Sequence, residues 1–102
     1  MQRGAEVDLQ DSAGGTALMW AARSGRERVV DLLLLRGAEV NLQDSDGDTA
    51  LMAAAGFGHE RVVDLLIRVV DLLINLQNSK GYTALMFAAL FNRPAVVRRL
   101  LR

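Results

Sequence analysis

The sequence predicts an all-α fold in which helix–turn–helix units stack into a solenoid, and two observations support this prediction. First, residues 8–19, 41–52 and 75–86 share the same pattern, which runs from Leu-Gln-Asx-Ser through a glycine to Thr-Ala-Leu-Met. Second, the threonines of this pattern stand at positions 16, 49 and 83, so the repeat period is 33 and then 34 residues. A period of this length is typical of a solenoid with one small helical unit per repeat.

The repeats divide the chain into four parts that form a single array. Residues 1–7 match the end of a repeat, because Arg3–Val7 has the same sequence as Arg36–Val40. Repeat one then covers residues 8–40, repeat two covers 41–74 and repeat three covers 75–102.

Each repeat contains the signals of a turn followed by two helices, as repeat one illustrates. Asp11–Gly14 is a turn sequence with an acidic start and a glycine end. Thr16 is well placed to cap a first helix over Ala17–Arg23, which a Ser-Gly pair ends. A second, more apolar helix is predicted over Glu27–Leu35, with Gly37 as its left-handed end. We therefore expect short turn fingers and paired helices in every repeat.

This unit resembles the ankyrin repeat over essentially the whole chain. The family's Thr-Pro-Leu-His motif stands here as Thr-Ala-Leu-Met in all three repeats, and its Gly-His-x-x-Val-Val pattern stands as Gly58–Val63. The missing proline and histidine depart from the family pattern. The resemblance implies a non-enzymatic protein-binding module, and it implies that His59 has a structural role in the loop.

Composition excludes several other functions. The chain has no cysteine, one histidine, and 12 basic against 12 acidic residues. We therefore predict no catalytic residue, metal, cofactor or small-molecule substrate, and no nucleic-acid or membrane partner. Asp44, Asp46 and Asp48 alternate as in a calcium loop, but Ala55 stands where such a loop needs glutamate, so we interpret them as a solvated turn. The first residues lack the apolar stretch of a signal peptide, which is compatible with the cytoplasm and leaves the location open.

The resemblance also implies where a protein partner would bind, namely at the turn tips and on the concave side of the first helices. The candidate partner-binding residues are Ser12, Arg23, Asp46, Asp48, Phe57, Lys80, Tyr82, Leu90 and Phe91. We expect the aromatic members to contribute most of the binding energy. The alternative that Phe57 and Phe91 only cover the small core stays open.

Two other groups of residues are predicted to have structural roles. Trp20, Ala53 and Phe87 occupy equivalent helix positions, and their large-small-large pattern indicates packing between repeats. Arginines at positions 93, 98, 99 and 102 form a basic edge on the last repeat. We interpret this edge as a polar cap, with an acidic partner as the alternative.

Repeat two carries a feature that departs from the family. Its segment 61–67 is copied unchanged as 68–74, and no glycine or proline interrupts His59 through Asn78. We therefore predict one extended second helix over residues 60–74, and the alternative is that the second copy forms a loop. An unchanged copy beside diverged repeats indicates a recent or deliberate duplication, so we expect an engineered variant.

The duplication leads to two hypotheses about function. A helix reaching residue 74 would carry repeat three roughly 9 Å past its docking position. Exchange of repeat three between two chains would then give a homodimer, with Val69, Val70, Leu72 and Leu73 at the self-association contact. The alternative is a monomeric scaffold that binds a different protein through its turn tips and concave face.

Overall fold

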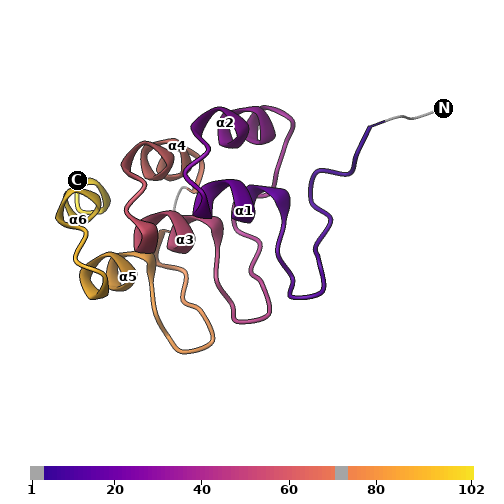
Figure 1. The fold of residues 1–102 in the computed structure, drawn as a ribbon. Helices are drawn as coiled ribbons and strands as arrows, with labels where there is room; N and C mark the ends of the chain where they lie inside the picture. Colours follow the sequence, from indigo (N-terminus) through magenta and orange to yellow (C-terminus); the bar gives the residue numbers. More distant parts are fainter. Residues whose placement is uncertain (1–3, 71–73) are drawn as a thin grey trace.

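The computed structural model describes residues 4–70 and 74–102, and this part of the chain forms an all-α solenoid without strands (Figure 1). Its helices are α1 (Ala17–Arg23), α2 (Glu27–Leu35), α3 (Ala50–Phe57), α4 (Glu60–Val70), α5 (Ala84–Leu90) and α6 (Pro94–Leu100). Helices α1, α3 and α5 form one layer, and α2, α4 and α6 form the other. None of the described helices has the length and apolar character needed to cross a membrane. The predicted solenoid is confirmed.

Local sequence signals determine where the helices begin and end. The hydroxyl oxygens of Thr16, Thr49 and Thr83 accept hydrogen bonds from backbone N–H groups three residues later, at 3.2, 3.2 and 3.3 Å. Each threonine thus satisfies one of the free donors of its helix, as expected for an N-cap. The predicted bounds of α1 and α2 are both correct. Gly37 follows α2 with a φ of +86°.

The core lies between the two layers and between neighbouring repeats. Alanines on the inner helices, such as Ala22, Ala54 and Ala88, are fully buried. Valines on the outer helices, such as Val30 and Val63, are also fully buried. Because alanine side chains are short, the inner helices pack closely and bring successive fingers, the turns at 11–15, 44–48 and 78–82, into hydrogen-bonding contact.

The two junctions between repeats share the backbone hydrogen bond that joins adjacent fingers. The Ser45 N–H donates to the Ala13 carbonyl and the Ser79 N–H donates to the Asp46 carbonyl, both at 2.9 Å. A second set of hydrogen bonds joins the helix ends, where a side chain of one repeat contacts a backbone carbonyl of the preceding repeat. His59 Nε2 lies 2.8 Å from the Arg23 carbonyl oxygen. Repeat three is therefore seated on repeat two of the same chain, as repeat two is seated on repeat one.

The predicted helix over residues 60–74 is only partly correct. Helix α4 has 11 residues against 9 in α2, so the second helix of repeat two is extended. It ends at Val70 in the described residues, however, and Ile74 lies in a 3₁₀ turn with Asn75. A straight helix through residue 74 would move repeat three away from its seat. The seated position buries apolar side chains, among them Ala88 and Val96, and this burial outweighs further helix propagation.

The predicted self-association residues have different environments. Val70 is 2% exposed and lies with Ile74 beside Leu51 and Met52, whereas Val69 is 46% exposed. Leu72 and Leu73 lie outside the described residues. Val70 is therefore occupied within its own chain. The predicted displacement of repeat three, which was the reason to expect exchange, is wrong because the junction between repeats two and three keeps the contacts of the junction before it.

Candidate functional site

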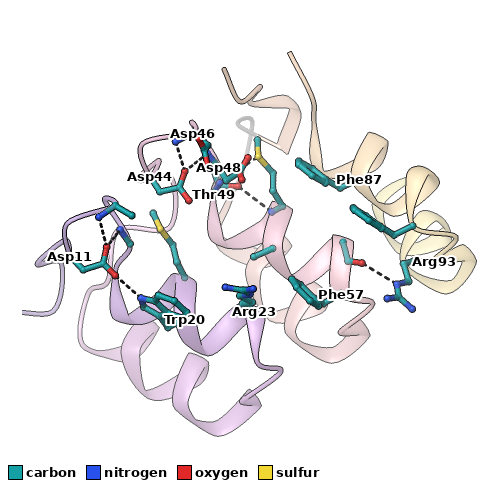
Figure 2. A pocket seen from close by; sticks show the side chains of 17 residues that line it. Asp11, Trp20, Arg23, Asp44, Asp46, Asp48, Thr49, Phe57, Phe87 and Arg93 are labelled. Carbon is teal, nitrogen blue, oxygen red and sulfur yellow. Dashed lines mark hydrogen bonds between the residues drawn. The ribbon is translucent and has the colours of Figure 1, made fainter. Parts of the chain in front are cut away.

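A groove of about 420 Å³ runs where the fingers meet the inner helices (Figure 2). Its residues fall into an acidic wall from the fingers, a floor of small and sulfur-containing side chains, and a wall of aromatic and basic side chains. The acidic wall contains Asp11, Asp44, Asp46 and Asp48; the floor contains Met19, Met52, Ala53 and Gly56; the other wall contains Trp20, Arg23, Phe57, Phe87, Phe91 and Arg93. The groove therefore combines apolar surface with opposite charges on its two sides.

The aromatic wall presents large rings to solvent. Trp20 is 53% exposed, and Phe57 and Phe91 are exposed to a similar degree. The Arg23 guanidinium lies between the first two of these rings, 5.6 Å from the centre of Trp20 and 5.2 Å from the centre of Phe57. Phe91 stacks on Phe87 with ring centres 6.2 Å apart. Such rings supply much contact area at little cost in conformational entropy when they are held in place by neighbours.

Hydrogen bonds hold Trp20 against the first finger. Its indole Nε1–H donates to Asp11 Oδ2 at 2.9 Å, and the Gly15 N–H donates to Asp11 Oδ1 at 2.7 Å. These bonds, the one from Trp20 above all, lower the pKa of the Asp11 carboxyl because they stabilise its charged form. The ring is therefore fixed at the edge of the groove before any ligand arrives.

The second finger contributes three carboxylates that lie close together. One oxygen from each of Asp44, Asp46 and Asp48 lies within 4.8 Å of the others. Asp44 Oδ1 accepts the N–H groups of Asp46 and Asp48, which shapes the turn, and Asp48 Oδ1 accepts the Asn78 side-chain amide at 2.8 Å. Two of the three carboxylates therefore have internal roles, which explains their position without a bound ion.

We expect Asp48→Asn to stabilise the fold at neutral pH. Partial burial, followed by repulsion from Asp44 and Asp46, raises the pKa of Asp48 above its ordinary value of 3.8. The charged carboxylate therefore weakens the folded state at pH 7, and this cost disappears when both states are protonated below about pH 3.8. Asparagine keeps an acceptor for Asn78 and removes the charge.

Urea unfolding at several pH values tests this expectation. The variant should be more stable than the parent at pH 7, and the difference should shrink as the pH falls toward 3.8. The exposed Asp31→Asn variant reports the general effect of removing one negative charge. A difference that does not change with pH, or equal effects of the two variants, would contradict the assigned environment of Asp48.

The groove brings together five of the predicted partner-binding residues and leaves out four. Its lining includes Arg23, Asp46, Asp48, Phe57 and Phe91. The four outside it are exposed and are Ser12, Lys80, Tyr82 and Leu90. Tyr82 supports the wall of the groove from outside, because its ring packs edge-on against the lining residue Phe87 with the ring centres 5.7 Å apart.

The predicted packing between repeats holds for Phe87, which is half-buried against the core, but it is wrong for Trp20. Both residues line the groove, and Trp20 is half-exposed. Ala53 is the small residue between them, so the large-small-large pattern leaves a hollow instead of filling one. The same pattern was therefore a usable signal for the groove, since equivalent positions on adjacent inner helices lie side by side.

The polar residues of the helix ends are structural ties between repeats. His59 contacts the Arg23 carbonyl, which is consistent with the expected loop role. Arg93 replaces it in repeat three and donates through Nε–H to the Gly56 carbonyl at 3.1 Å. Arg99 lies 3.4 Å from Glu60 and 3.2 Å from Asp64. The polar-cap interpretation is therefore wrong for these two arginines, because both join repeat three to repeat two.

Comparison with known proteins agrees with the observed helix pairs. A family profile described as "Ankyrin repeats (3 copies)" matches residues 1–44 and 18–102, which together cover the chain. No curated protein matches the sequence. Ankyrin repeats are non-enzymatic modules for protein–protein interaction. The match, the threonine-capped inner helices and the finger ladder lead to one conclusion: the chain belongs to the ankyrin repeat family.

Proposed function

We propose that the groove between the fingers and the inner helices binds an extended segment of a partner protein. The observation that carries the proposal is the set of half-exposed aromatic rings, Trp20, Phe57 and Phe91, around a hollow of about 420 Å³. A groove of this volume accepts one or two side chains, and rings held by neighbours are the residue types that dominate binding energies at protein interfaces.

The charges on the groove favour a basic residue in the partner segment. Four aspartates lie on the finger side, and the two arginines lie on the opposite side. Arg93 already donates to Gly56, and the Arg23 guanidinium lies between two rings. A segment that presents an apolar side chain to the rings and a lysine or arginine to the fingers would therefore complement both walls.

Peptides selected from a random display library test this proposal. Selection on the 102-residue chain should enrich sequences with a basic residue near an apolar one. Trp20 is the only tryptophan, so binding should also shift its fluorescence. Phe57→Ala should weaken binding of the selected peptides by about 30-fold, which corresponds to about 2 kcal/mol.

Arg28→Ala is the matched control, because this exposed side chain belongs to α2 and does not line the groove. It should leave peptide affinity unchanged. Selected peptides that tolerate Phe57→Ala, or that lose affinity with Arg28→Ala, would show that the groove is not the binding surface.

Self-association is the second candidate function, and exposed apolar side chains at both ends of the array favour it. Exchange of repeat three would need a hinge between α4 and Ile74, at residues outside the described part of the chain. Such a dimer would keep the contacts between repeats and change only the chain that supplies them. The exchange therefore stays a prediction, and the experiment in the next subsection separates it from a different mode of association.

A further inference from the structure

Repeat one exposes residues that the equivalent positions of the later repeats bury. Val62 and Val96 are both 1% exposed because they pack against the preceding repeat, whereas the equivalent Val29 is 46% exposed. Ala17 is likewise exposed, although the equivalent Ala50 and Ala84 are buried. We call Ala17, Val29 and the adjacent exposed Leu32 the leading face.

Repeat three exposes the opposite side of the same interface. Met86 is 49% exposed, whereas the equivalent Met19 and Met52 are 9% and 2% exposed because the next repeat covers them. Ala89 is exposed, although the equivalent Ala22 and Ala55 are fully buried. We call Met86 and Ala89 the trailing face. Apart from Leu32, whose equivalent in repeat three is Arg99, the two faces thus consist of the same residue types that already pack together twice inside the chain.

We propose that the leading face of one copy docks on the trailing face of a second copy, so that the solenoid continues from chain to chain. The evidence is the identity of the residues: Ala, Val and Met at these positions form both internal junctions, and each residue has its counterpart on the other copy. Contact between two different faces does not form a two-fold dimer, so association should continue beyond two copies, into a ring or an open filament.

The polar groups at the two ends are also complementary. Within the described residues, the Ser12 N–H and the Lys80 carbonyl have no hydrogen-bond partner. Ser12 is equivalent to Ser45 and Ser79, whose N–H groups donate between fingers inside the chain. Lys80 is equivalent to Ala13 and Asp46, whose carbonyls accept these bonds. The finger ladder would therefore extend across the contact between copies without any change in the fingers.

A second polar contact would extend at the helix ends. Arg26 occupies the position of Arg93, which donates to the Gly56 carbonyl. Leu90 occupies the position of Gly56, and its carbonyl has no N–H donor four residues later because residue 94 is proline. Arg26 of one copy can therefore donate to Leu90 of the other in the same way.

Several internal contacts have no counterpart between copies, because Leu32 occupies the position of Arg99 and Tyr82 occupies the position of Asp48. Arg61 pairs with Glu27 across the first junction at 3.1 Å, but Pro94 stands at the equivalent acidic position of repeat three. Exposed ion pairs of this kind contribute little to stability. A greater difference is that separate copies lack the covalent link that holds adjacent repeats together. The association should therefore be reversible and dependent on concentration.

Sedimentation and light scattering of the full chain from about 1 μM to about 1 mM test the proposal. The average mass should increase with concentration past twice the monomer mass of 11.1 kDa. Two variants each damage one face: Ala17→Glu with Val29→Glu, and Met86→Glu with Ala89→Glu. Each variant alone should associate at least about ten-fold more weakly than the parent, because a charged group would enter an apolar contact. A mixture of the two should form a 1:1 pair that does not grow, since each variant keeps one intact face.

Leu35→Glu is the matched control. Leu35 is exposed, and its equivalents Arg68 and Arg102 are exposed as well, so this position lies outside both faces. This variant should associate like the parent, and circular dichroism should show that all variants are folded. The proposal is overturned if the parent stays monomeric over the whole range, or if the mixture does not pair. It is also overturned if either face variant still dimerises alone, which would indicate exchange of repeat three or a two-fold contact.

Discussion

Alanine in place of Gly47 should destabilise the fold by about 3 kcal/mol, whereas alanine in place of Gly37 should cost only about 1 kcal/mol. Both glycines have a positive φ, +79° and +86°, so both substitutions carry the cost of a left-handed backbone. They differ in their surroundings. A Cβ at Gly47 would lie 2.7 Å from the Ser79 nitrogen, whereas a Cβ at Gly37 would meet nothing within 4 Å.

The difference between the two substitutions therefore measures the close approach of the second and third fingers. Ser79 donates to Asp46 at this point, so the clash would also disturb the hydrogen bond that joins the fingers. Urea unfolding of both variants gives the comparison directly. Equal losses would mean that the backbone conformation accounts for the whole effect and that the fingers are not in close contact.

Features that depend on a few neighbouring residues could be predicted from the sequence. Thr16 and Gly37 determine helix ends through their own hydrogen bonds and backbone angles, and the predicted bounds of α1 and α2 are correct for this reason. The end of α4 was not predictable in the same way. The residues after Arg68 are compatible with a continued helix, and only the docking of α5 on α3 requires the chain to turn back.

The groove was partly predictable, and the missing part has a physical reason. Phe57 and Phe91 are predicted as partner-binding residues; both are half-exposed and line the groove, and partner binding through them stays a prediction. Trp20 was assigned to packing, because a repeat pattern shows which side chains share a face but not whether a small neighbour leaves space beside them. Ala53 leaves that space, and the bond from Asp11 holds the indole at its edge. The groove is thus a property of several repeats together.

Val70→Asp should destabilise the fold by roughly 3–4 kcal/mol, whereas Val69→Asp should have an effect of less than about 1 kcal/mol. Both residues lie in the last turn of α4, so an acidic side chain has the same unfavourable interaction with the helix dipole at both positions. Val70 is buried beside Ile74, Leu51 and Met52, and Val69 is half-exposed. Only the first substitution therefore places an unpaired charge in the core.

This comparison tests how the duplicated segment is accommodated. If Val69 and Val70 both lay at a contact between two copies, both substitutions would weaken association and neither would greatly change the stability of dilute monomer. If Val70 instead belongs to the core of its own chain, Val70→Asp should lower the urea midpoint at all protein concentrations. Val69→Asp should then match the parent, because the segment after Arg68 contributes to the fold through Val70 and Ile74, which are packed beside residues of repeat two. A similar loss from both variants would place Val69 in an apolar contact and would contradict the assignment of Val70 alone to the core.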